Sequence, residues 1–175
     1  MSLKVILPVE VPVSFGQKLA SSEAFKSLFR EGMTLVEGAA SYLDGEGREQ
    51  SRKLPRIEAL AYASESMRLT TRLMQLASWL LLQRAVNEGE LTQAQAANEK
   101  RKVRLDAQEQ TSSAEVFSRL PQRLRELVEH SLVLQDRVLR LDRMIYDVED
   151  DAPRRSAVNP VEIQLDMLRN ALQIN

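Results

Sequence analysis

The sequence contains no cysteine, and it has only one histidine, six glycines and six prolines among its 175 residues. The absence of cysteine excludes disulfides, thiolate nucleophiles and Cys-ligated zinc, and it fits a reducing cytosol. No stretch reaches the roughly 18 continuous apolar residues of a membrane-spanning helix, so we expect no membrane partner. The apolar run near the N-terminus is broken by Pro8 and Pro12 and is too short for a signal-peptide core.

Residue patterns typical of catalysis are also missing. There is no glycine-rich phosphate loop, no serine nucleophile elbow and no His–carboxylate metal pattern. His130 could act as a general base, but it lies at the edge of an apolar stripe, and a boundary residue with an ordinary partner is favoured. The acidic run from Glu149 to Asp151 could bind a divalent cation weakly, although a solvated helix end is favoured. We therefore predict no enzymatic activity, no cofactor and no metal site.

The overall charge gives no reason to expect nucleic-acid binding. The formal net charge is −1, with 28% charged and 43% hydrophobic residues. The basic run from Lys100 to Arg104 could contact phosphates, but no aromatic residues are interleaved with it, so we predict no nucleic-acid partner. The composition is that of an ordinary helical domain with one core.

Hydrophobic periodicity predicts an all-α fold, an antiparallel three-helix bundle. The long helices are expected at about 21–43, 56–87 and 121–148, with a polar, turn-rich loop at 44–54 and a short extra helical segment near 93–106. We expect the bundle domain to span 1–151, with residues 1–14 extended. Residues 152–175 are predicted to be a flexible linker followed by a short amphipathic tail.

The segment from Leu60 to Val86 is predicted to be the central helix. It contains neither proline nor glycine, and its apolar residues fill an arc of roughly 180°, which must lie against two neighbours. The predicted inward residues are Leu60, Met67, Leu69, Leu73, Met74, Ala77, Leu80, Leu81 and Ala85. The opposite, polar arc holds Glu65, Arg68, Thr71, Arg72, Gln75 and Gln83.

Trp79 falls in the middle of that polar arc. Either another segment of the chain covers the indole, such as the N-terminal strand or the helix after Ala94, or the indole waits for a partner. Trp and Arg are typical interface anchors. The candidate dimer or partner patch comprises Arg68, Arg72, Trp79, Leu82 and Val86. Self-association is the simplest use of such a patch.

Small and polar residues interrupt two of the apolar stripes. Gly32 lies in the stripe of the first helix, where it permits close helix approach. Ser131, Gln135 and Asp142 lie near the midline of the third helix's stripe. They could form a site, but fixing the register of helix packing is favoured. We expect them to meet Ser66, Thr70 and Thr71 of the central helix.

The tail repeats apolar residues at helical spacing after Pro160. A helix of roughly 13 residues is marginal alone and needs a surface to fold upon. The residues expected to bind a partner groove are Val161, Leu165, Leu168 and Leu172. Docking of the tail onto its own bundle is the alternative, and the sequence favours neither.

Two stretches resemble a known family. Ser14 to Arg48 contains FREGM and SYLDGEGR, and Tyr62 to Leu91 contains ESMRLTTRLMQLASWLL. These runs are similar to the alphaproteobacterial regulator of CtrA degradation (RcdA) family. The similarity covers both of the first long helices and the loop between them, and the third helix is similar in pattern.

The resemblance implies a three-helix bundle that forms a homodimer and has no catalytic activity. It implies an adaptor for the ClpXP AAA+ protease, which brings protein substrates or further adaptors to the protease in the cell cycle. The implied localisation is cytoplasmic, with a polar position left open. The alternative from the residues is a homodimeric helical scaffold without a delivery role.

Overall fold

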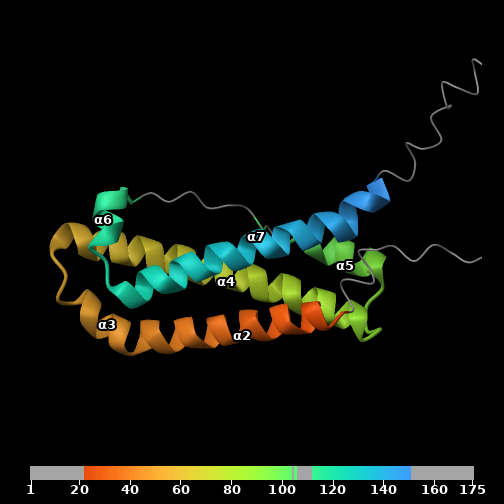
Figure 1. Ribbon diagram of the computed structural model, residues 1–175, viewed down its shortest axis with the longest axis horizontal. Helices are drawn as coiled ribbons and strands as arrows, with labels where there is room; N and C mark the ends of the chain where they lie inside the picture. Colours follow the sequence, from red (N-terminus) through yellow and green to blue (C-terminus); the bar gives the residue numbers. More distant parts are fainter. Residues whose placement is uncertain (1–21, 104, 106–111, 151–175) are drawn as a thin grey trace, which may run out of the picture.

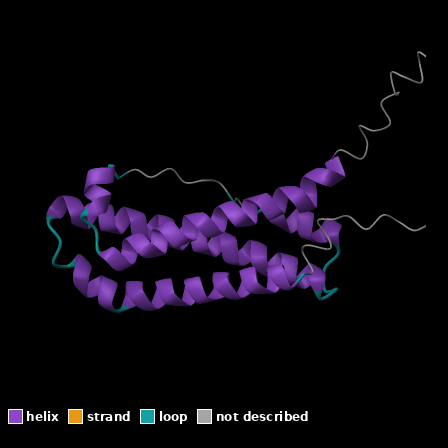
Figure 2. Cartoon of the chain, in the orientation of Figure 1, coloured by secondary structure: helices purple, strands orange, loops and turns teal. Residues whose placement is uncertain are grey.

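The computed structural model describes residues 22–103, 105 and 112–150, in which all regular structure is helical (Figure 2). Three long helices lie side by side, with short helices at the ends of the bundle (Figure 1). The helices are α2 (Glu23–Asp44), α3 (Glu46–Ser51), α4 (Arg56–Asn87), α5 (Gln93–Lys100), α6 (Ala114–Ser118) and α7 (Gln122–Asp150). None of them is long and apolar enough to cross a membrane. The predicted all-α class is confirmed.

The directions of the long helices differ from the prediction. α2 runs antiparallel to α4 and α7, but α4 and α7 run in the same direction (Figure 1). Arg72 of α4 contacts Ser131 of α7, and further along α4 Trp79 contacts Asp142, so the contacts advance together. The expectation of an antiparallel α4–α7 pair is wrong because the segment between them returns the chain to the start of α4 before α7 begins.

The predicted boundaries of α2, α4 and α7 agree with the structure to within two residues, whereas the connections differ. The predicted loop at 44–54 contains α3, the extra helix ends at Lys100 instead of near 106, and α6 was not expected. Gly47 is buried in α3, and a Cβ there would lie 2.5 Å from Tyr62 Oη. This glycine permits close packing inside a helix, where the sequence analysis predicts a loop.

α4 packs against both α2 and α7, as the width of its apolar arc predicted, but through a different face (Figure 1). Of the predicted inward residues, Leu69, Leu73 and Leu80 are buried. Four others are 51–72% exposed, namely Leu60, Met67, Met74 and Leu81. The buried face instead holds Ala61, Tyr62, Glu65, Leu69, Arg72, Leu73, Leu76, Trp79, Leu80 and Gln83. Half of the predicted polar arc, Glu65, Arg72 and Gln83, therefore faces the core, whereas Thr71 is exposed.

α2 buries the stripe that its periodicity predicted. Phe25, Leu28, Leu35 and Ala39 are all at most 5% exposed. Gly32 lies in the same stripe, where a Cβ would be 2.5 Å from Leu80 Cδ1 and 3.7 Å from Leu134 Cδ2. The three long helices thus meet at this glycine.

Gly32→Leu should destabilise the fold by about 1–3 kcal/mol, because the added side chain overpacks a position that Leu80 already fills. Chemical denaturation of the two proteins measures the loss. The control is Gly38→Leu on the same helix, where the nearest atom to a new Cβ is Arg123 Nη2 at 4.0 Å. That variant should be neutral or slightly more stable, since leucine is the better helix former. Equal losses at both positions would contradict the packing argument.

Candidate protein-interaction site

One carboxylate, that of Asp142 on α7, joins three helices. The Trp79 indole of α4 donates its Nε1–H to Asp142 Oδ1 at 2.7 Å. The Lys100 ammonium of α5 lies 2.7 Å from Asp142 Oδ2, and it also lies 4.1 Å from the centre of the Tyr146 ring. Because Trp79 is 1% exposed and Asp142 is 8% exposed, these contacts are shielded from water. They hold α5 against the α4–α7 pair.

A second buried polar contact lies earlier on the same interface. Arg72 is 1% exposed and donates from Nη1 to Ser131 Oγ at 2.8 Å. Burial lowers the pKa of Arg72, and the negative charge of Glu65, which lies on the same face, opposes this shift. The guanidinium stays protonated, since arginine is charged even with a lowered pKa. Glu65 accepts a 2.9 Å hydrogen bond from Ser112, which follows the α5 region of the chain.

The structure therefore corrects the predicted patch of Arg68, Arg72, Trp79, Leu82 and Val86. Trp79 and Arg72 are buried inside the chain and cannot contact a partner in this conformation. The other three residues are half-buried. The sequence left two coverings of Trp79 open. The helix after Ala94 lies beside the indole, since Lys100 of α5 shares the carboxylate of Asp142, and the N-terminal segment lies outside the described residues.

The midline residues of the third helix are buried as expected, but their partners are different. Ser131, Gln135 and Asp142 are at most 8% exposed. Thr70 and Thr71 do not reach them; their hydroxyls donate to the carbonyls of Ser66 and Met67 on their own helix. The polar residues of α7 thus fix how α7 packs along α4 and are not open to a ligand.

Asp142→Ala should lower the free energy of unfolding by about 1–3 kcal/mol, because the buried indole N–H loses its acceptor. Urea denaturation followed by the fluorescence of Trp79, the only tryptophan, measures the loss. Asp136→Ala is the matched control on α7. Its exposed carboxylate pairs with Arg140 one turn away, so the loss should stay within about 0.5 kcal/mol. Similar losses in both variants would show that the Asp142 contacts contribute little.

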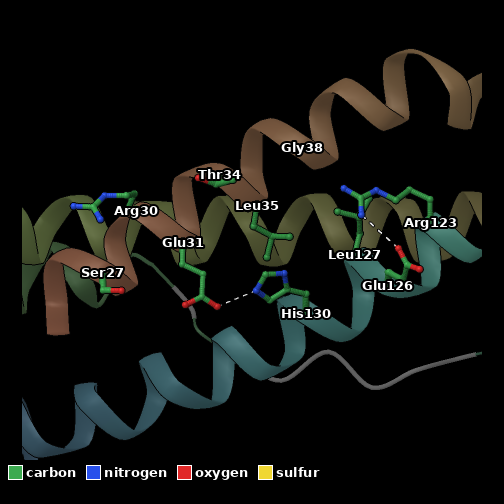
Figure 3. Close-up of a pocket in the computed structure, with 10 residues that line it drawn as sticks. All are labelled: Ser27, Arg30, Glu31, Thr34, Leu35, Gly38, Arg123, Glu126, Leu127 and His130. Atoms are coloured by element: carbon green, nitrogen blue, oxygen red, sulfur yellow. Dashed lines mark hydrogen bonds and ion pairs between the residues drawn. The ribbon is translucent and has the colours of Figure 1, made fainter.

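A groove of about 500 Å³ runs between α2 and α7 (Figure 3). His130 lies on its floor and points towards Glu31, with Nε2 2.9 Å from Glu31 Oε1. Arg137 donates to the other oxygen of Glu31 at 2.6 Å. The only histidine is thus a half-exposed boundary residue paired with a carboxylate. Its partner lies 99 residues away in the sequence, which is why periodicity alone could not name it.

Two opposing effects act on the pKa of Glu31. Burial raises it, but hydrogen bonds from His130 and Arg137 and their charges lower it, and the net pKa lies below the ordinary 4.5. A lowered folded-state pKa means that the ionised carboxylate stabilises the fold above the ordinary value. This contribution is lost as the pH falls through the folded-state pKa.

Glu31→Gln should therefore reduce stability at pH 7, and the difference from the wild type should shrink as the pH falls below 4.5. Thermal denaturation across pH 3–7, a range set about the ordinary pKa of a carboxyl group, gives the two curves. Glu129→Gln, which alters an exposed carboxylate on α7, serves as the control. Its thermal stability should match that of the wild type at each pH. A constant offset between Glu31→Gln and the wild type at all pH values would contradict this account.

An uncharged surface lies on α4, on the side of the helix away from its buried face. We define the α4 outer face as Leu60, Ala63, Ser64, Met67, Thr70, Thr71, Met74, Ala77, Ser78 and Leu81. All ten are exposed or half-exposed, and none carries a charge. Scattered single apolar residues are ordinary on a protein surface, but a continuous uncharged helix face marks an interaction site. In the sequence, the signal for this face is the absence of charge along the arc. The sequence analysis assigns that arc to the core.

An apolar groove lies between the start of α2 and the end of α4. Its volume is about 650 Å³, and Phe25, Phe29 and Met33 contribute its apolar wall. The Arg84 guanidinium lies 5.2 Å from the centre of the Phe29 ring, a cation–π contact. Arg84 also pairs with Glu88 at 2.7 Å, so a charged rim borders this groove.

Other predicted site residues can be placed only in part. Val161, Leu165, Leu168 and Leu172 lie outside the described residues. In the basic run, Lys100 pairs with Asp142 and Lys102 with Glu99, so both ammonium groups have carboxylate partners. Within the described ranges no group of three His, Asp or Glu residues is arranged to hold a metal ion.

Comparison with known proteins identifies the family to which this fold belongs. A family model described as "Protein of unknown function (DUF1465)" matches residues 16–172. The solved structure of RcdA from Caulobacter crescentus CB15 is similar, with 49% sequence identity and a TM-score of 0.61. The alignment covers 74% of this chain and 97% of that one. The chain belongs to the RcdA family. No curated protein matches it.

The match to RcdA confirms the resemblance seen in the sequence. Because nearly the whole of the solved RcdA chain is covered, the similarity concerns the entire fold and is not limited to one helix pair. The family model also extends over the tail residues up to Leu172, which lie beyond the described part of the bundle. The family model therefore covers most of the tail as well as the bundle.

Proposed function

We propose that this chain is a non-catalytic adaptor that tethers protein substrates or further adaptors to a ClpXP-type AAA+ protease. It would thereby regulate the turnover of cell-cycle regulators, acting as a homodimer in the cytoplasm. The observation that carries the proposal is the 49% identity to RcdA across 97% of that chain. The resemblance to the RcdA family implies a role in regulated proteolysis.

The physical features of the bundle support an adaptor. Tethering requires surfaces for two partners and a linker, and it does not require a nucleophile or a metal. The α4 outer face and the apolar groove beside Phe29 are two separate surfaces on a rigid frame. A tail that grips a partner would raise its local concentration to roughly millimolar.

The tail is the proposed partner-binding element, through Val161, Leu165, Leu168 and Leu172. Their spacing predicts one apolar face of a helix, which would suit a hydrophobic groove on another protein. The second candidate function is a homodimeric scaffold without a delivery role. The α4 outer face favours this alternative, since such a face serves self-association whether or not cargo is delivered.

A reconstituted degradation assay separates the two functions. The full chain, added to the protease with a candidate substrate, should accelerate degradation, and the chain truncated after Asp151 should not. The melting temperature should be nearly unchanged by the truncation, because the described core residues lie between Phe25 and Ile145. A scaffold would leave the degradation rate unaltered in every case.

A matched pair of tail variants sharpens this test. Leu165→Ser with Leu168→Ser should abolish the acceleration, since the sequence predicts both residues on the apolar face. Asp166→Ser with Asn170→Ser changes the predicted opposite face and should keep the acceleration. Equal activity of the two variants would contradict a helix-in-groove role for the tail.

A further inference from the structure

The apolar groove between α2 and α4 lies where the described part of the chain begins. Its apolar wall, Phe25, Phe29 and Met33, is carried by the first three turns of α2, and the last turns of α4 border it (Figure 1). Phe29 and Met33 are only partly buried, so they keep apolar surface that no described residue covers. A volume of about 650 Å³ is typical of a site that takes a ligand or a peptide.

The residues that precede α2 in the sequence have an alternating pattern. From Leu3 to Val13 the sequence is LKVILPVEVPV, in which every odd-numbered residue is leucine or valine. The even-numbered positions hold Lys4, Ile6, Pro8, Glu10 and Pro12. A period of two predicts an extended segment with one apolar face, and the two prolines oppose a helix. We call Leu3–Val13 the N-terminal segment.

An extended segment with one apolar face needs a surface that covers this face. Among the described residues all regular structure is helical, so they offer no sheet edge with which the segment could pair. A groove between two helices is then the suitable surface. Pro8 and Pro12 carry no backbone N–H, which reduces the number of donors left unpaired when the segment lies against side chains.

We infer that the N-terminal segment folds back along α2 and docks in this groove, with its odd-numbered side chains against Phe25, Phe29 and Met33. Nine residues, 14–22, connect the segment to α2, which is long enough to reverse the direction of the chain. So short a connection keeps the segment at a high local concentration beside the groove. The tail has no such connection, because it follows α7, and no residue of α7 lines the groove.

The length of the segment fits the groove. The α2 residues that line it run from Phe25 to Glu37, which is about 18 Å of helix at 1.5 Å per residue. In extended form, the stretch from Val5 to Val11 spans about 20 Å. Its four odd-numbered side chains therefore extend over the whole apolar wall.

The charges beside the groove also fit a segment that folds back. On the rim, Lys26 pairs with Glu23 and Arg84 pairs with Glu88. Arg30 and Glu37 are exposed and form no ion pair within the described ranges. Folding back brings Glu10 nearer to the start of α2, on the side of Arg30, and brings Lys4 towards Glu37. The opposite direction along α2 would place like charges together.

Engineered disulfides test the docking in the full chain, which has no cysteine of its own. On oxidation, Val9→Cys with Met33→Cys should form a disulfide within one chain at least about tenfold faster than Val9→Cys with Ser27→Cys. Ser27 is exposed and nearer to the connection, but it faces the other groove, between α2 and α7 (Figure 3). Equal rates for the two pairs would overturn the inference, since an undocked segment reaches both positions.

The alternation provides a matched pair of variants. Leu7→Ser, added to the Val9→Cys with Met33→Cys chain, should slow disulfide formation to the rate of the Ser27→Cys pair, because Leu7 belongs to the docked face. Ile6→Ser removes an apolar side chain of similar size from the opposite face and should leave the rate unchanged. Equal effects of the two substitutions, whether large or small, would contradict an extended segment docked through its odd-numbered residues.

Other occupants of the groove would give different results. A disulfide between Leu165→Cys of the tail and Met33→Cys that forms faster than the Val9→Cys with Met33→Cys disulfide would place the tail in the groove and overturn the inference. A Val9→Cys with Met33→Cys chain that crosslinks mainly into a product of doubled mass on a non-reducing gel would show a second copy there, with the same consequence.

The docking does not depend on the adaptor proposal. The disulfide rates are measured on the purified chain without protease or substrate, so a failed degradation assay would leave the docked segment standing. Conversely, a segment that does not dock would leave the adaptor proposal to its own assay. If both hold, a partner that binds beside Phe29 has to displace the segment first.

Discussion

The Asp142 carboxylate is the contact that sets the packing of the rest of the bundle. It accepts the indole N–H of Trp79 and pairs with the ammonium of Lys100, so a single side chain links α4, α5 and α7. Both contacts have lengths of 2.7 Å in an interior with little water. With Arg72 and Ser131 further along, they fix the register of α7 on α4. Apolar contacts alone would allow such a pair to slide by a turn more easily.

These contacts also determine which side of α4 faces outwards. Once Arg72, Trp79 and Gln83 point inwards, the opposite side of a helix must face outwards. That side holds Met67 and Met74, residues that would otherwise be expected in a core. The polar interior of the monomer and its uncharged outer face are therefore two results of one rotation of α4 about its axis. This rotation links the fold to the proposed interface.

Much of the fold could be predicted from the sequence, because local patterns decide it. α2 buries the stripe of Phe25, Leu28, Leu35 and Ala39, and α4 begins after Pro55 where a proline suits the first turn. The rotation of α4 could not be predicted in this way. It depends on Ser131 and Asp142, which lie 59 and 63 residues beyond their partners. A helix that is apolar on one side and holds Trp and Arg on the other can face the core with either side.

The directions of the helices also determine which elements share an end of the bundle. The start of α2 and the end of α7 lie at the same end of the bundle, while α3 and α6 lie at the other (Figure 1). Because α4 and α7 also run in the same direction, a partner at that end would meet the first turn of α2 together with the last turns of α4 and α7, whereas a partner at the other end would meet α3 and α6. The two ends of the bundle are therefore platforms of different composition.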